Sequence, residues 1–260
     1  MDKNRVAVIT GGATGVGAAT ALMLAERGWH AVINYSRSSL EAEKTSAQCS
    51  KIGPKAIAVR GDVADDDECK QVIAEARKAF GRVDAVVNSA GTTKFVPMDE
   101  LDRQNAEDFQ EVYAVNVIGT YQMTRAAAAL MKESGSGSVV NVSSISALTG
   151  NGSSFAYVTS KAALNTLTLS LARALSPSIR VNCVMPGLIE TRWLQSGLGT
   201  DVYNSVRENF SNSSALEKTC KPEDVADAIV WLIEGAALVT GQLITVDGGF
   251  LLGRPPRVSR

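Results

Sequence analysis

The sequence predicts an α/β domain built on a doubly wound parallel sheet of seven strands with helices on both faces. Short runs rich in Val, Ile and Ala alternate with longer helical stretches along nearly the whole chain. These runs lack strict polar–apolar alternation, which is typical of strands buried on both faces of a parallel sheet. Alternating strands and helices favour right-handed crossovers and a doubly wound topology. No repeat or linker divides the chain, so we expect a single domain over residues 1–260.

Glycine and proline mark the ends of the expected elements. The first strand, residues 6–10, runs into a pair of glycines, and the helix at 15–27 stops at Gly28. Gly53 and Pro54 end the helix that follows the second strand. The other strands are predicted at residues 31–34, 57–60, 85–88, 138–142, 180–185 and 243–246, and the other helices at 39–51, 66–80, 106–132, 155–175 and 223–234.

Two segments do not fit this alternation. Residues 190–214 are the least periodic part of the chain, with few core residues and several glycines and asparagines. A loop-rich insertion of this length in a compact domain is usually functional or mobile, so we expect a lid there. Residues 251–260 carry three arginines and the pair Pro255-Pro256, which predicts an extended C-terminal arm.

Charge and composition exclude several function classes. The 26 basic and 27 acidic residues leave a net charge of −1, which disfavours nucleic-acid binding. No run of about 18 apolar residues exists, so we expect no membrane span. The apolar run near the N-terminus is too short for a signal peptide, which favours a cytoplasmic protein. Four scattered cysteines without a CxxC pair and a single histidine predict reduced thiols and no metal site.

A glycine-rich turn joins the first strand to the first helix. It has the spacing T-G-x-x-x-G-x-G, from Thr10 to Gly17. Such a turn brings backbone without Cβ atoms close to a pyrophosphate and lets helix N–H groups face the negative charge. The alternative is a purely structural turn, but the order strand, glycines, helix favours dinucleotide binding. The cofactor contacts expected here are Gly11, Thr14, Gly15, Val16 and Gly17.

Several further motifs follow in order, and with the glycine turn they resemble the short-chain dehydrogenase/reductase family over roughly residues 4 to 250. Asn88-Ser89-Ala90-Gly91 is similar to the N-N-A-G motif of that family, with Ser89 in place of the second Asn. Residues 157–161 read Y-x-x-x-K. Pro-Gly follows the sixth strand, and Asp-Gly-Gly follows the last. The resemblance implies a Rossmann fold and hydride transfer between a nicotinamide and a carbonyl or secondary alcohol.

A tyrosine and a lysine four residues apart form the centre of the candidate catalytic site. Tyr157 and Lys161 share one face of a predicted helix, where an ammonium group favours the phenolate and lowers the tyrosine pKa. An exposed tyrosine with an incidental lysine is the alternative. The resemblance implies that Tyr157 transfers the proton, Ser144 polarises the substrate oxygen, Lys161 binds the nicotinamide ribose and Asn116 holds a water in a proton relay. Ser143 is the alternative candidate for the serine that polarises the substrate oxygen.

The end of the second strand bears on which nicotinamide is used. An acidic residue there would bind the adenosine ribose and repel a 2′-phosphate. This strand instead leads into Ser36-Arg37-Ser38, a plausible phosphate cradle that favours NADP(H) over NAD(H), although these residues also suit a loop and helix cap. By resemblance the remaining cofactor contacts are Asp62, Val63, Asn88, Ala90, Gly91, Tyr157, Lys161, Pro186, Gly187, Ile189 and Thr191.

The expected substrate pocket is apolar. Its walls are predicted at residues 92–98, 146–155 and 188–198. The side chains expected to make these walls largely apolar are Thr93, Phe95, Leu148, Trp193 and Leu194. With the predicted cofactor, this pocket makes the chain most similar to 3-oxoacyl-thioester reductases and general carbonyl reductases. An NAD-dependent alcohol, sugar or steroid dehydrogenase and a non-catalytic cofactor-binding regulator stay open as alternatives.

The quaternary structure is predicted by resemblance alone. Two long helices, predicted within residues 106–132 and 155–175, pair across a dimer interface in the family, and tetramers are common there. We therefore expect a homo-oligomer, either a dimer or a tetramer.

Overall fold

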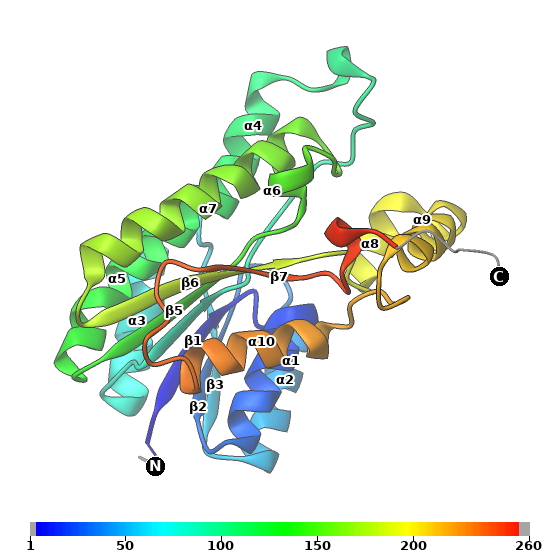
Figure 1. The fold of residues 1–260 in the computed structure, drawn as a ribbon. Coiled ribbons are helices and arrows are strands. Elements are labelled where there is room, and N and C mark those ends of the chain that lie inside the picture. Colours follow the sequence, from blue (N-terminus) through cyan, green and yellow to red (C-terminus); the bar gives the residue numbers. More distant parts are fainter. Residues whose placement is uncertain (1–3, 255–260) are drawn as a thin grey trace.

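A seven-stranded parallel sheet forms the centre of the molecule, which the computed structural model describes from residue 4 to residue 254 (Figure 1). The order across the sheet is β3-β2-β1-β4-β5-β6-β7. The chain moves outward in one direction from β1 to β3 and in the other from β4 to β7. The predicted doubly wound α/β fold is confirmed, and its topological switch point lies between β1 and β4. The strands are β1 (Val6–Thr10), β2 (His30–Tyr35), β3 (Ala56–Arg60), β4 (Ala85–Asn88), β5 (Gly137–Val142), β6 (Ile179–Pro186) and β7 (Leu243–Val246).

Helices cover both faces of the sheet (Figure 1). One layer contains α1 (Gly15–Glu26), α2 (Ser39–Ile52) and α10 (Pro222–Glu234), and the other contains α3 (Asp66–Phe80), α5 (Thr120–Glu133) and α7 (Phe155–Leu175).

Strand β1 is apolar from Val6 to Ile9 because both of its faces are covered by helices. Ala7 and Ile9 pack into the core beneath α1 and α10, whereas Val6 and Val8 pack into the core beneath α3 and α5. Successive side chains of a strand point to opposite faces, so a strand between two helix layers needs apolar residues throughout. Each aliphatic side chain buried in this way contributes about 1.5–3 kcal/mol to folding.

Local sequence signals set several helix ends. Asp65 caps α3 by accepting hydrogen bonds from the backbone N–H groups of Asp67 and Glu68. Gly81 ends the same helix with φ of 76°, a left-handed conformation that favours glycine. The acidic run at residues 65–68 therefore starts a helix, as its charge predicts.

The predicted helix at 106–132 is wrong in one respect, because it is interrupted. It consists of α4 (Ala106–Tyr113), a π-helical segment (Ala114–Gly119) and α5. The wider π turn keeps the chain helical and leaves the apolar pattern nearly continuous, so the break has no clear signal in the sequence. It places Asn116, which is fully buried, where its side chain bonds to the loop that follows β4.

The segment expected to be loop-rich, residues 190–214, contains two helices, α8 (Arg192–Leu198) and α9 (Thr200–Ser213). Gly199 separates them with φ of 78°. Buried Phe210 anchors α9 by stacking on Phe250 at a ring separation of 4.2 Å. The aromatic contact comes from a distant part of the chain, which is why local periodicity did not reveal it.

The start of the predicted C-terminal arm is folded. A 3-10 turn (Phe250–Leu252) packs near α9, and the Arg254 guanidinium bonds to the Ser214 carbonyl and pairs with Glu217. Residues 255–260 of the predicted arm lie outside the described residues. A second 3-10 turn (Leu101–Arg103) and α6 (Ser146–Thr149) complete the helical elements of the described chain.

None of the helices between residues 4 and 254 has both the length and the apolar character needed to cross a membrane. The four cysteines are buried and carry free thiols. Within the same residues, no group of three or more His, Cys, Asp or Glu side chains is arranged to hold a metal ion.

Candidate functional site

A cavity of about 1220 Å³ lies at the carboxyl ends of the strands. In a doubly wound sheet this edge is where loops diverge at the switch point and leave a crevice. The structure brings most of the predicted site residues together around this cavity. They are Gly11, Thr14, Gly15, Val16, Ser36, Arg37, Ser38, Asp62, Val63, Ala90, Gly91, Ser144, Tyr157, Lys161, Pro186, Gly187, Ile189 and Thr191.

Three predicted residues lie behind the cavity wall instead of on it: Gly17, Asn88 and Asn116. A Cβ on Gly17 would overlap the backbone of Gly11, so this glycine permits the close packing of the turn. The Asn88 amide donates to Asn141 at 2.9 Å and to Thr124 at 3.1 Å. Gly17 and Asn88 therefore support the site from beneath.

The N-terminus of α1 opens into the cavity without a side-chain cap. Thr14 holds an extended backbone there but makes no side-chain capping bond, and the first turn contains no acidic residue. A Cβ on Gly11 would lie 3.0 Å from the backbone of Ala90, so a larger residue would crowd this turn. The unpaired N–H groups and the positive end of the helix dipole make this turn suited to bind an anionic group such as a pyrophosphate.

The cavity also extends past the end of β2. Ser36, Arg37 and Ser38 line this part, and Arg37 is exposed. The Asn34 amide donates to the Gly61 carbonyl at 2.9 Å, which ties the end of β2 to the loop after β3. A guanidinium between two hydroxyl groups can hold a phosphate through several donors.

Tyr157 and Lys161 lie near the start of α7, as their spacing predicts. Ser154 caps this helix by accepting from the Tyr157 N–H at 3.2 Å. The Lys161 Nζ lies 5.6 Å from the centre of the Tyr157 ring and donates to the Val142 carbonyl at 2.8 Å. Burial lowers the pKa of Lys161 to about 8, because the protein interior disfavours the ammonium form.

The sequence predicts that Lys161 lowers the pKa of Tyr157, and this prediction is wrong for the protein without bound cofactor or substrate. Burial raises the pKa of Tyr157, and a hydrogen bond with the Ser144 side chain acts in the opposite direction. Lys161 does not overcome the burial effect, because the same interior that disfavours the phenolate also disfavours the ammonium. The tyrosine hydroxyl is therefore held in its protonated form at neutral pH.

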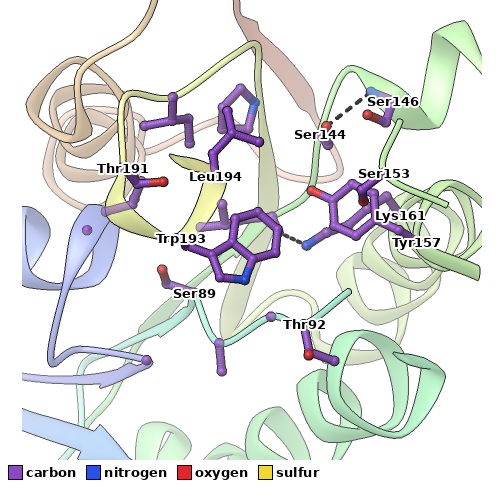
Figure 2. Close-up of a pocket in the computed structure, with 18 of the residues that line it drawn as sticks. Ser89, Thr92, Ser144, Ser146, Ser153, Tyr157, Lys161, Thr191, Trp193 and Leu194 are labelled. Atoms are coloured by element: carbon purple, nitrogen blue, oxygen red, sulfur yellow. Dashed lines mark hydrogen bonds between the residues drawn. The ribbon is translucent and has the colours of Figure 1, made fainter. Parts of the chain in front are cut away.

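The two candidate serines have different partners. The Ser144 oxygen accepts from the backbone N–H of Ser146 at 3.1 Å and faces the cavity beside Tyr157 (Figure 2). The Ser143 hydroxyl donates to the Lys161 carbonyl at 3.1 Å and so binds the backbone of α7. Ser144, and not Ser143, brings its hydroxyl to the tyrosine.

Asn116 links three parts of the site. Its Oδ1 accepts from the Thr92 N–H at 2.8 Å, and its Nδ2 donates to the Thr92 carbonyl and to Ser160 Oγ, both at 3.0 Å. A Cβ on Gly91 would lie 3.5 Å from Asn116 Oδ1 and 3.7 Å from Lys161 Nζ. Asn116 therefore lies near the lysine and orients the loop after β4. Nothing in the sequence pattern pointed to Thr92 and Ser160 as its partners.

Aromatic side chains form one wall of the cavity. The Trp193 ring lies 5.7 Å from Phe95 and 6.3 Å from Tyr157. In Figure 2 the Trp193 indole of α8 lies beside Tyr157 and Lys161. Phe95 rests against Gly197, where a Cβ would overlap its ring.

The predicted pocket walls are only partly correct. Phe95, Trp193 and Leu194 line the cavity, whereas Leu148 is 55% exposed and, like Thr93, does not line it. Phe210 and Phe250 also line the cavity, although the sequence reasoning did not include them. Their pairing joins segments 40 residues apart, and no local pattern predicts it.

The arrangement combines two chemical capacities. An open helix end and a guanidinium are suited to a phosphate-bearing dinucleotide. Two hydroxyl groups, Tyr157 and Ser144, converge near a buried lysine and can move a proton at a substrate oxygen.

Comparisons with known proteins agree with this geometry. The family model described as enoyl-(acyl carrier protein) reductase matches residues 11–251. Over 244 residues the chain is 40% identical to a protein of Streptomyces violaceoruber assigned as ketoacyl reductase 2 of the granaticin polyketide synthase, covering 94% of this chain and 95% of the relative. It is 37% identical over 255 residues to the L-rhamnose 1-dehydrogenase (NAD(P)(+)) of a Sphingomonas strain, covering 95% and 96% of the two chains. A crystal structure of a protein from Burkholderia xenovorans assigned as a short-chain dehydrogenase/reductase superposes with a TM-score of 0.90 at 39% identity, covering 97% of this chain and 100% of that one.

The lowered pKa of Lys161 predicts a pH-dependent stability. Between pH 8 and pH 10.5 the unfolded chain keeps the lysine proton while the folded chain has lost it, so the contribution of this site to stability rises with pH. From pH 7 to pH 10.5, we expect the free energy of unfolding of the wild type to gain about 3 kcal/mol relative to Lys161→Met.

Denaturant unfolding of both proteins at the two pH values measures this difference. The comparison cancels the titration of Cys49, Cys69 and Cys220, which both proteins share, and a Cys183→Ser background in both proteins removes the thiol that interacts with Lys161. A difference that stays constant with pH would contradict the lowered pKa.

Proposed function

The chain belongs to the short-chain dehydrogenase/reductase family, and on that premise we propose that it is an NADP(H)-dependent reductase of 3-oxoacyl thioesters or related carbonyl compounds. Members of this family are oxidoreductases that act on C=O and CH–OH groups with NAD(P). The observation that carries the proposal is the convergence of the Tyr157 and Ser144 hydroxyls beside buried Lys161, next to the open end of α1.

A nicotinamide held beside Tyr157 would supply the hydride to the carbonyl carbon in reduction and would accept it in oxidation. Tyr157 donates its proton to the carbonyl oxygen as that oxygen gains negative charge, and the product is an alcohol. Ser144 donates a hydrogen bond to the same oxygen, which stabilises the developing charge. In the oxidative direction the Tyr157 phenolate accepts the alcohol proton.

Lys161 and Asn116 support the proton transfer. A phenolate forms at Tyr157 when the proton leaves, and the neighbouring ammonium stabilises it. A pKa of about 8 lets Lys161 release and regain a proton near neutral pH. Asn116 Oδ1 and Lys161 Nζ both border the position that a Cβ on Gly91 would take, so Asn116 is placed to hold a water in a proton relay with the lysine.

The cavity suits a dinucleotide at its other end. The uncapped turn of α1 would hold the pyrophosphate, and Asp62 and Val63, which line the cavity, would flank the adenine ring. The preference for NADP(H) is supported by Arg37, which lies among hydroxyls with no acidic residue at the end of β2. An arginine attracts the 2′-phosphate, whereas an acid would repel it.

The substrate class is supported by the wall opposite Tyr157. Phe95, Trp193 and Leu194 present apolar surface, which suits an uncharged carbonyl group with an apolar chain or ring. The ketoacyl reductase relative from the granaticin system points to the same class.

The first competing function is that of an NAD(P)-dependent sugar or alcohol dehydrogenase, and the L-rhamnose dehydrogenase relative favours it. A sugar would need several polar partners, and Ser146, Asn151 and Ser153 on the cavity wall are the candidates. The second alternative, a regulator that only binds the cofactor, has no use for the matched set of Asn116, Ser144, Tyr157 and Lys161.

Replacing Tyr157 by Phe removes the proton donor and retains the ring. We expect kcat/KM for an acetoacetyl thioester with NADPH to fall by about 100- to 10,000-fold, while NADPH still binds. Absorbance of NADPH measures turnover, and nicotinamide fluorescence measures binding. Tyr113→Phe, on α4 away from the cavity, is the matched control. Unchanged turnover in Tyr157→Phe would contradict the proposed catalytic role.

Replacing Arg37 by Ala removes the cation proposed to bind the 2′-phosphate. We expect the Kd for NADPH to rise about tenfold and the Kd for NADH to change little, since a hydrogen bond to a charged group is lost for NADPH alone. Arg173→Ala, an exposed arginine of α7, serves as the control. Equal losses for both cofactors would count against a phosphate contact.

We propose that residues 190–214, with α8 and α9, form a lid over the substrate. The lid is tied to α2 by the ion pair between Arg192 and Glu41 at 3.2 Å, and both side chains are exposed. Exposed pairs of this kind are weak, so α8 can move away from α2, whereas Phe210 anchors α9. We expect proteolysis between residues 190 and 214 to slow when NADPH is added. Equal cleavage rates with and without NADPH would contradict this role.

We also propose a homo-oligomer, either a dimer or a tetramer. Exposed apolar side chains on the helical face support it: Phe109, Ile118 and Tyr121 around α4 and α5, and Leu169 on α7. Burial of such side chains favours association. Size-exclusion chromatography with light scattering at micromolar concentration should show at least twice the monomer mass, and a monomer would refute the proposal.

A further inference from the structure

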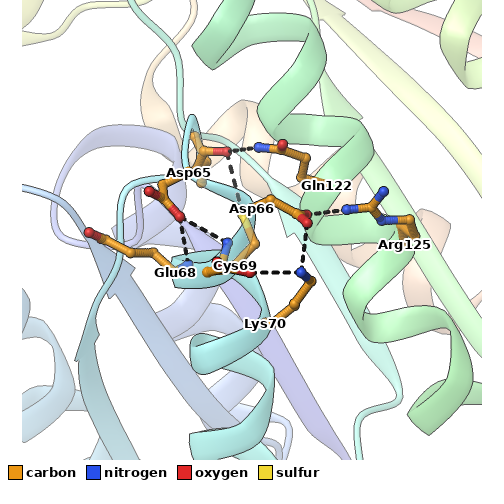
Figure 3. Close-up of polar contacts among 9 residues, drawn as sticks. Asp65, Asp66, Glu68, Cys69, Lys70, Gln122 and Arg125 are labelled. Atoms are coloured by element: carbon orange, nitrogen blue, oxygen red, sulfur yellow. Dashed lines mark hydrogen bonds and ion pairs between the residues drawn. The ribbon is translucent and has the colours of Figure 1, made fainter.

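The loop between β3 and α3, residues 61–65, is contacted by helix α5 through Gln122 (Figure 3). Two of its residues, Asp62 and Val63, line the cavity at the end assigned above to adenine. Asp62 is exposed to the cavity, whereas Val63 is buried with 6% exposure. The position of this loop therefore sets one wall of the cofactor site.

Bonds within the loop define its shape. The Ala64 N–H donates to Asp62 Oδ1 at 3.0 Å, and the Asp65 N–H donates to the Asp62 carbonyl at 3.0 Å. The Asp62 N–H donates to Glu68 of α3 at 2.6 Å. All of these partners belong to the loop or to the helix that follows it. The first loop residue, Gly61, is tied to β2 by the Asn34 amide and the Tyr35 carbonyl, so these bonds fix where the loop begins but not where Val63 lies.

Gln122 provides a contact from a different element. Its Nε2 donates to the Val63 carbonyl at 2.8 Å, across 59 residues of sequence. The same carbonyl accepts from the Cys69 thiol at 3.4 Å. A thiol is a weak donor, so the amide of Gln122 is the stronger partner of this carbonyl.

Two neighbours on the same side of the helix act with Gln122. Gly119 lies one turn earlier, and a Cβ there would lie 2.8 Å from both the carbonyl oxygen and a methyl group of Val63. Arg125 lies one turn later and forms an ion pair with Asp66 at the start of α3. Positions three residues apart share a helix face, so one face that runs from Gly119 into α5 contacts Val63 of the loop and Asp66 at the start of α3.

The same helical element also reaches the catalytic end of the cavity. The π-helical segment Ala114–Gly119 carries Asn116, which bonds to Thr92, and it continues directly into α5 with Gln122. A rigid helix connects the two ends, so the loop at residues 61–65 keeps a set distance from the lysine and tyrosine.

We propose that Gln122 is a positioning residue for the adenosine half of the cofactor. It acts through Val63, because it holds the loop that presents Asp62 and Val63 to the cavity, and it does not touch the reacting atoms. The inference rests on the proposed function, since it requires a dinucleotide in this cavity. Gln122 therefore contributes to the affinity for the whole dinucleotide but not to the proton-transfer chemistry.

The test compares a cofactor that has an adenosine half with one that lacks it. Wild type and Gln122→Leu are assayed with NADPH and with reduced nicotinamide mononucleotide, using the same carbonyl substrate. We expect the Kd and KM for NADPH to rise about two- to tenfold, as the loss of one hydrogen bond predicts, with kcat within about twofold of the wild type. The kcat/KM for reduced nicotinamide mononucleotide should not change.

Two further variants exclude a general structural effect. Gln71→Leu makes the same replacement at an exposed site on α3 and should leave the KM and kcat/KM for both cofactors unchanged. Gly119→Ala pushes on Val63 from the same helix and should repeat the selective loss for NADPH if Gln122→Leu does not fold.

The outcomes separate this inference from the proposed function. Unchanged NADPH affinity in Gln122→Leu would overturn the inference while the wild type remains active. Equal losses with both cofactors would also overturn it, because they indicate general loosening. If the wild type neither binds nor oxidises NADPH, the proposed function fails first, and the failure is visible before any variant is compared.

Discussion

The reversal of chain direction between β1 and β4 is the constraint on which the rest of the structure depends. Two neighbouring parallel strands that lead to opposite sides of the sheet leave a crevice at their carboxyl ends. The open N-terminus of α1 faces this crevice, and the loops after β2, β3, β4, β5 and β6 surround it. Residues that are far apart in the sequence meet there because every parallel strand ends at the same edge.

Burying the ammonium group of Lys161 at this edge of the sheet costs desolvation free energy. Lys161 is 5% exposed, and the Val142 carbonyl provides one fixed hydrogen bond to its ammonium group. The low-polarity surroundings that lower its pKa also keep the hydroxyl of Tyr157 protonated. In the proposed mechanism this burial keeps the proton on Tyr157 until a substrate oxygen accepts it, so the proposed chemistry and the energetic cost have one physical origin.

Helix α5 and the π-helical segment before it link the two ends of the cavity. Asn116 contacts the loop after β4, and Gln122 contacts the loop after β3. The acidic run at residues 65–68, which could be mistaken for a metal site in the sequence, has structural partners instead. Asp65 caps α3, and Asp66 pairs with Lys70 and Arg125 (Figure 3). Glu68 accepts from the backbone N–H of Asp62 in the loop.

The sequence by itself determined the strands, most helix ends, the glycine turn and the tyrosine–lysine pair. These features depend on local physics: apolar runs, capping residues such as Asp65, and a spacing of four on one helix face. Only the tertiary structure decided the π-helical break at Asn116, the helices of residues 190–214, and the raised pKa of Tyr157. Each depends on partners distant in the chain, such as Thr92 for Asn116 and Phe250 for Phe210, and on burial, which exists only after the layers have packed.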